Sequence, residues 1–85
     1  MSLTFSDSAW EDYQYWQQSD KKKFKRINTL IKDAQRNGYD GIGKPEPLKN
    51  NLSGYWSRRI DSEHRLVYKV TKDGHLIAQV RYHYK

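Results

Sequence analysis

Hydrophobic positions in the first half of the chain recur with the period of a helix. Trp10, Tyr13 and Trp16 lie three residues apart, which predicts a first helix that ends near Gln18, and several side chains at residues 6–8 are able to cap its start. These rings either build the core or stack on nucleic-acid bases, and core packing is the more common use of such a face.

A second helix is predicted from Asp20, a capping residue, to Asn37-Gly38, where glycine favours a helix end. Its apolar positions keep the helical period while lysines and arginines occupy the other faces. The apolar residues are Phe24, Ile27, Leu30, Ile31 and Ala34.

The other segments alternate apolar and polar residues, which is typical of strands. Leu3 and Phe5 predict a short first strand, and residues 39–51 form a loop rich in Gly, Pro and Asn. Three antiparallel strands follow, at residues 52–60, 64–71 and 75–84. We therefore expect an α+β fold in which two N-terminal helices pack on one face of a four-stranded, mostly antiparallel sheet, with residues 1–85 as a single domain.

The alternation also predicts which residues share a sheet face. The apolar residues expected to face the helices are Trp56, Ile60, Leu66, Tyr68, Val70, Leu76, Ala78 and Val80. Three-residue turns would then place Arg59 opposite Arg65 and Arg65 opposite Arg81 on the other face, with His83 two residues further along.

Adjacent arginines on one sheet face repel one another, so their placement needs a cause beyond folding. A bound anion is one cause. The alternative is pairing with acids of the same chain, for which Glu46, Asp61 and Glu63 are the candidates.

Glu46 stands between Pro45 and Pro47, and the prolines restrict the backbone on both sides of it. The carboxylate is therefore either held in a fixed place for chemistry or is a solvated acid in a surface turn.

Composition favours a polyanionic partner. Sixteen Lys and Arg against ten Asp and Glu give a formal charge of +6, which suits a nucleic acid, a nucleic-acid-rich particle or an acidic protein, although solubility alone also explains a net charge. There is no cysteine, and neither a signal-type segment nor a membrane span is predicted, so a cytoplasmic location fits.

No cofactor or metal is expected. His64, His75 and His83 have no metal-ligand spacing, and no phosphate-binding glycine motif is followed by a helix. His64 and His75 lie beside predicted turns and are expected to be solvated. Metal-free RNA cleavage needs a base, an acid and cations around phosphorus, and Glu46 and His83 suit the two proton-transfer roles.

The chain is similar to the YoeB toxins of the RelE superfamily in motifs that occur in order along nearly its whole length. These are Lys44-Pro45-Glu46-Pro47-Leu48-Lys49, the segment Asn51-Leu52-Ser53-Gly54-Tyr55-Trp56-Ser57-Arg58-Arg59-Ile60, Glu63-His64-Arg65-Leu66-Val67-Tyr68, and Arg81-Tyr82-His83-Tyr84. The final Lys85 departs from the family's usual Tyr-His-Tyr end.

The resemblance implies a ribosome-dependent mRNA interferase that cuts the message in the A site, with the 2′-hydroxyl as nucleophile. It implies that Glu46 is the general base, that His83 is the general acid and that Arg65 stabilises the charged phosphorane. It further implies that Lys49 and Arg59 are supporting cations and that Tyr84 positions or stacks on a base. Arg81, from the predicted arginine face, completes the candidate RNA-binding residues.

The same resemblance implies partners: mRNA on the ribosome, a YefM-like antitoxin whose acidic segment covers the basic site, a second copy of the toxin, and operator DNA that is bound only by the toxin–antitoxin complex. Two other functions remain open from the sequence. One is a non-catalytic basic module that binds RNA or the ribosome, and the other is a DNA-binding co-repressor.

Overall fold

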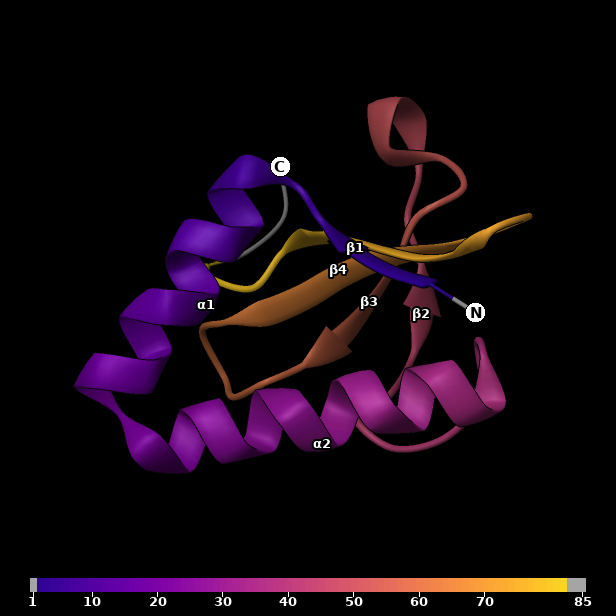
Figure 1. Ribbon diagram of the computed structural model, residues 1–85. Coiled ribbons are helices and arrows are strands. Elements are labelled where there is room, and N and C mark those ends of the chain that lie inside the picture. The colour runs from indigo at the N-terminus through magenta and orange to yellow at the C-terminus, as the bar shows by residue number, and fades with distance from the viewer. Residues whose placement is uncertain (1, 83–85) are drawn as a thin grey trace.

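The computed structural model describes residues 2–82, which form two helices and a mixed sheet (Figure 1). The elements in chain order are β1 (Ser2–Phe5), α1 (Asp7–Ser19), α2 (Lys21–Asn37), β2 (Glu46–Pro47), the 3-10 helix η1 (Asn50–Leu52), β3 (Trp56–Arg59), β4 (Arg65–Thr71) and β5 (Gly74–Gln79). The strand order is β1-β5-β4-β3-β2, with β1 parallel to β5 and the other pairs antiparallel.

The α+β class is confirmed, but the sheet has five strands where four were predicted. The additional strand is β2, which lies in the segment predicted as a loop and pairs with β3 at the sheet edge. An edge strand tolerates proline because the missing N–H need not face a neighbour, so Pro47 does not prevent the pairing.

Both helices begin and end where the capping residues indicate. The Ser6 side chain accepts a hydrogen bond of 3.2 Å from the backbone N–H of Ala9, and the Asp20 side chain accepts one of 3.1 Å from Lys23. Gly38 ends α2 with a φ of 66°, in the left-handed region that glycine adopts easily.

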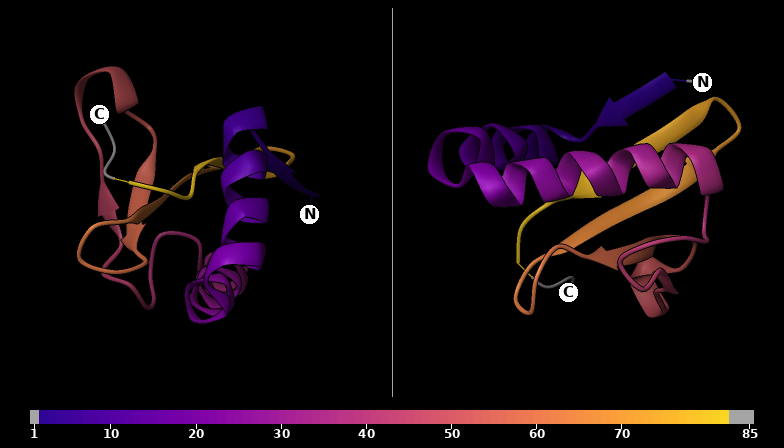
Figure 2. Two further views of the ribbon diagram at one scale, coloured as in Figure 1. Left: turned by 90° about the vertical axis from the view of Figure 1, so that its left-hand side faces the viewer. Right: turned by 90° about the horizontal axis from the view of Figure 1, so that it is seen from below.

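The helices cover one face of the sheet, and the β2–η1–β3 hairpin forms the edge opposite β1 (Figure 2). The buried apolar residues between the two layers are Ala9, Trp16, Ile27, Leu30, Ile31, Ala34, Ile60, Leu66, Tyr68, Ile77 and Val80. Trp16 is therefore a core residue, whereas Trp10 is 47% exposed.

The predicted register is correct between β3 and β4, where Arg59 lies opposite Arg65, and wrong in part of β5. A two-residue turn pairs Thr71 with Gly74, and a register shift returns β5 to the predicted phase only at Gln79, opposite Val67. Between these points the faces are exchanged, so that Ile77 is buried in the core in place of the predicted Leu76 and Ala78.

His64 and His75 are buried, with 7% and 3% exposure, so the expectation that they are solvated is wrong. The exchanged faces of β5 turn His75 toward α2, where its Nε2 lies 3.1 Å from the carbonyl oxygen of Ala34.

Neither α1 nor α2 has the length and apolar character needed to cross a membrane.

Candidate functional site

The sheet face away from the helices gathers the candidate acid and two of the candidate cations. Glu46 pairs with Ser57, and Arg59 pairs with Arg65. Directly paired residues point to the same face, and residues two apart on a strand share a face, so these four side chains lie on one surface. The structure thus brings Glu46, Arg59 and Arg65 together across three adjacent strands.

Backbone hydrogen bonds on both sides of Glu46 hold its strand. The backbone N–H of Arg59 donates to the carbonyl of Gly43 at 2.7 Å, and that of Leu48 donates to the carbonyl of Tyr55 at 2.9 Å. Glu46 itself is exposed. The loop carboxylate is consequently fixed in the hairpin while its side chain stays accessible.

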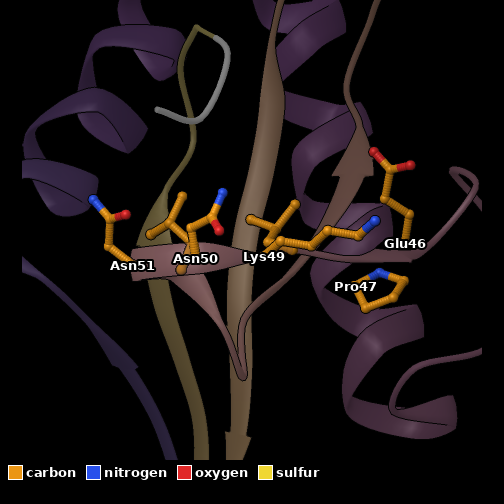
Figure 3. A pocket seen from close by; sticks show the side chains of 7 residues that line it. Glu46, Pro47, Lys49, Asn50 and Asn51 are labelled. Carbon is orange, nitrogen blue, oxygen red and sulfur yellow. The ribbon is translucent and has the colours of Figure 1, made fainter.

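A pocket of about 370 Å³ opens beside Glu46 and continues along the hairpin to η1. Its lining residues are Glu46, Pro47, Leu48, Lys49, Asn50, Asn51 and Leu52. In Figure 3 the Lys49 side chain extends toward Glu46. An acid and a cation thus line one accessible concavity, which also offers the amide side chains of Asn50 and Asn51.

Arg65 is almost buried, with 8% exposure, and within residues 2–82 its guanidinium is held by backbone oxygens. One terminal guanidinium nitrogen (Nη1) donates to the carbonyl of Asp61 at 2.7 Å and to that of His64 at 3.1 Å. Within residues 2–82, no carboxylate forms an ion pair with Arg65 or with the exposed Arg59. Their charges are therefore directed to the same face without a neutralising acid from this range.

The two acids of the β3–β4 turn have other partners. The Asp61 carboxylate lies 2.7 Å from the Lys23 ammonium on α2, and Glu63 lies 3.5 Å from the His64 ring. Burial raises the pKa of Asp61, but Lys23 and the backbone N–H groups of His64 and Glu63 outweigh burial and lower that pKa to about 2. Pairing with these two acids, one of the alternatives from the sequence, does not account for the arginines.

Arg81 does not join the other arginines, which corrects the sequence prediction. Its guanidinium lies 3.8 Å from the centre of the Tyr15 ring and 3.7 Å from the Asp12 carboxylate, both on α1. The physical reason is that β5 ends at Gln79, so the alternation of faces does not extend to residue 81.

His83 and Tyr84, two of the candidate residues, lie outside the described part of the chain. The last described residue is Tyr82, whose carbonyl accepts a hydrogen bond of 3.0 Å from the backbone N–H of Arg65. The described chain therefore ends beside Arg65.

Arg58 has a structural role that the sequence analysis missed. It is fully buried and donates to the hydroxyl of Tyr68, to the carboxylate of Asp33 and to backbone carbonyls of the segment after α2. These carbonyls belong to Gly38, Asp40 and Ile42. The hydrogen bond from Arg58 lowers the pKa of Asp33.

A signal for Arg58 was present in the sequence. The alternation that turns Arg59 outward turns Arg58 toward the helices, and a charge on a core face requires partners. Gly41 contributes to this arrangement, because a Cβ at this glycine would overlap the Asp33 carboxylate.

Among residues 2–82, no three His, Cys, Asp or Glu side chains gather as a metal-binding group.

Comparisons of the sequence and of the fold with known proteins all point to one family. Residues 5–84 match the model of the family described as YoeB-like toxin of bacterial type II toxin-antitoxin system. A curated relative, Toxin YoeB of Escherichia coli (strain K12), is 62% identical over 84 residues, which is 99% of this chain and 100% of the relative.

Two solved structures from Staphylococcus aureus are similar in fold and sequence. A YoeB-YefM complex contains a chain that is 56% identical with a TM-score of 0.91, and a YoeB dimer contains one that is 58% identical with a TM-score of 0.92. Each match covers 99% of this chain and 98% of the other.

Proposed function

The chain belongs to the family of YoeB-like toxins of bacterial type II toxin–antitoxin systems, and from this premise we propose that it is a metal-independent endoribonuclease that cleaves mRNA in the A site of a translating ribosome. The observation that carries the proposal is the shared sheet face of Glu46, Arg59 and Arg65, with a fixed, accessible carboxylate beside two cations. Because translating ribosomes are cytoplasmic, the proposed location of this protein is the cytoplasm.

In the proposed reaction Glu46 accepts the proton of the 2′-hydroxyl, whose oxygen attacks the adjacent phosphorus. The bond from phosphorus to the 5′-oxygen breaks, and His83 donates a proton to that leaving oxygen. The products are a 2′,3′-cyclic phosphate and a 5′-hydroxyl. Arg65 stabilises the charge that develops on phosphorus, and its fixed guanidinium supports this role because a preorganised cation need not move during the reaction.

Supporting roles are proposed for Lys49, Arg59 and Tyr84. Lys49 lines the pocket beside Glu46, and Arg59 lies opposite Arg65, so both cations suit phosphate contacts along the message. Tyr84 is proposed to stack on a base. Arg81 is left out of the RNA-binding set because its guanidinium packs against α1.

Partners are proposed from the relatives. The Staphylococcus aureus relatives were solved in a YoeB-YefM complex and as a YoeB dimer. We propose that this chain likewise pairs with a YefM-like antitoxin, whose acidic segment would neutralise the basic face, and that it forms a homodimer. Operator DNA is proposed as a partner of the toxin–antitoxin complex only.

The test is translation of a defined message in vitro with wild type, Glu46→Gln and Arg65→Gln, followed by mapping of new 5′ ends. We expect cuts within A-site codons with wild type and a loss of at least 100-fold with either variant. Glu11→Gln, which changes an exposed acid on α1, is the matched control and should cut like wild type.

The formal charge of +6 also favours a non-catalytic module that binds RNA or the ribosome, and the same experiment separates the two functions. A binding module would stall ribosomes on intact message, and Glu46→Gln would stall them as well as wild type does. A co-repressor without nuclease activity would neither cut nor stall. Either result would contradict the proposed cleavage.

A further inference from the structure

His64, the residue directly before β4, holds the end of the described chain through its side chain. The backbone N–H of Tyr82 donates a hydrogen bond of 2.7 Å to Nδ1 of His64. The buried imidazole ring also packs edge-on against Trp16, with ring centroids 4.8 Å apart, and against the Tyr82 ring at 5.4 Å. One buried histidine therefore joins α1, β4 and the segment that follows β5.

The backbone of Tyr82 needs this support because its φ is 62°, in the left-handed region that non-glycine residues rarely adopt. Both of its backbone polar groups are bonded. The N–H donates to His64, and the carbonyl accepts from the backbone N–H of Arg65 at 3.0 Å and from Nε2 of Gln79 at 3.2 Å. The bend at Tyr82 is thus fixed by groups from β4 and β5.

The hydrogen bond from Tyr82 requires Nδ1 of His64 to carry no proton, since a ring nitrogen that accepts cannot also donate. The ring proton then lies on Nε2, which is 3.5 Å from the Glu63 carboxylate. The backbone N–H of His64 donates to the Asp61 carboxylate at 2.7 Å. The orientation of the ring is therefore set by a contact at each ring nitrogen, with the accepting Nδ1 directed at Tyr82.

We propose that His64 is a positioning residue: by accepting the Tyr82 N–H it fixes the backbone to which the next residue, the proposed general acid His83, is attached. This inference rests on the proposed function and adds to it a residue that touches no substrate. The contribution of His64 is orientation. The cleavage rate falls in proportion to the fraction of time that the proton donor spends outside its reactive position.

Two substitutions separate the hydrogen bond from the packing. His64→Asn keeps an acceptor oxygen near the position of Nδ1 but lacks the ring, whereas His64→Phe keeps an aromatic ring against Trp16 but has no acceptor. His64→Leu is a second variant without an acceptor. The matched control is His75→Phe, which removes the other buried histidine, whose hydrogen-bond partner is the Ala34 carbonyl on α2.

The first measurement is single-turnover cleavage of message on programmed ribosomes, with toxin concentration varied to separate the maximal rate from half-saturation. For His64→Phe and His64→Leu we expect a 10- to 100-fold lower maximal rate with half-saturation changed less than about twofold. His64→Asn should recover most of the rate. His75→Phe should be less stable yet cleave at the wild-type maximal rate below its unfolding temperature.

The second measurement is amide hydrogen exchange at Tyr82, which reports the hydrogen bond directly. We expect at least tenfold faster exchange in His64→Phe than in wild type, with the β4 amides unchanged and with slow exchange restored in His64→Asn. A wild-type maximal rate in His64→Phe, or unchanged exchange at Tyr82, would overturn the positioning role.

The proposed function fails by a different result, namely full cleavage by Glu46→Gln or no cleavage by wild type. In that case the exchange measurement still decides whether His64 anchors Tyr82.

Discussion

Arg58 and Arg65 are both nearly inaccessible arginines on neighbouring strands, but they lie on opposite faces of the sheet and have different partners. Arg58, on the helix side, uses all three guanidinium nitrogens on a hydroxyl, a carboxylate and backbone carbonyls. Arg65, on the other side, donates to described residues from Nη1, to two carbonyls of its own turn.

The difference in partners indicates a difference in use. A buried charge is tolerated when its donors are satisfied and a counter-charge is present, as at Arg58, where Asp33 completes the set. Arg65 is oriented by backbone oxygens, and within residues 2–82 no acid forms an ion pair with its guanidinium. Arg65 is also paired directly with the positive Arg59, an arrangement that an anionic ligand would stabilise.

The largest expected effect is on activity and comes from Arg65. Arg65→Gln removes the fixed charge from the proposed phosphorane site, and we expect message cleavage to fall 10²- to 10³-fold, which is about 2.7–4 kcal/mol in activation free energy. The free energy of unfolding should fall by about 1–2 kcal/mol, since two hydrogen bonds to carbonyls of described residues are lost while the repulsion from Arg59 is relieved. Cleavage assays beside urea denaturation check both values.

The converse substitution is expected at Arg58. Arg58→Met keeps the side-chain volume but removes the cation that pairs with the Asp33 carboxylate and one donor from each of three carbonyls, which should lower the free energy of unfolding by about 3–5 kcal/mol. Urea denaturation measures this loss. Full stability of Arg58→Met would contradict the structural role of Arg58. A folded fraction as inactive as Arg65→Gln would contradict the assignment of activity to the Arg65 face.

Much of this arrangement follows from the sequence because it depends on short-range patterns. The helix periods and the caps at Asp20 and Gly38 needed only local information. The pairing of Arg59 with Arg65 depended on one turn, whose acid at Asp61 accepts the N–H groups of the turn itself.

The failures are at positions where a distant segment decides the outcome. The two-residue turn between Thr71 and Gly74 exchanged the faces of His75 and Ile77, and the register shift between Val67 and Tyr68 then restored the predicted phase. Arg81 was assigned to the wrong face because the strand stops early, at Gln79. The role of Arg58 depends on Asp33 and on carbonyls at 38–42, which a pattern within one strand cannot show.

A smaller effect is expected from inorganic anions on the Arg65 face. At constant ionic strength, replacing chloride by phosphate at about ten times its Kd should stabilise wild type by about 1.4 kcal/mol. Thermal unfolding measures the shift. Arg65→Gln should lose most of it and Arg59→Gln part of it, whereas Lys22→Gln, an exposed lysine on α2, should keep it. An equal shift in all the variants would mean that phosphate acts through net charge.

The smallest expected effect concerns Asp61, whose backbone carbonyl accepts a hydrogen bond from Arg65. Its pKa of about 2 in the folded protein lies below the ordinary value of 3.8, so its ionised form favours folding. The contribution is complete above about pH 4 and is lost as the pH falls through about 2. Solvent screens this partly exposed pair, so we expect a loss of about 1 kcal/mol.

Two variants decide which cation Asp61 stabilises, and with it whether the charge of Arg65 remains available. Unfolding of wild type, Asp61→Asn and Lys23→Met is measured between pH 2 and pH 6. If the Lys23 pair lowers the pKa of Asp61, as the 2.7 Å contact indicates, both variants should lose part of the acid-sensitive stability while Arg65→Gln keeps it. The reverse result, with the sensitivity lost in Arg65→Gln and retained in Lys23→Met, would mean that Asp61 neutralises Arg65 in solution and that the contrast with Arg58 is wrong.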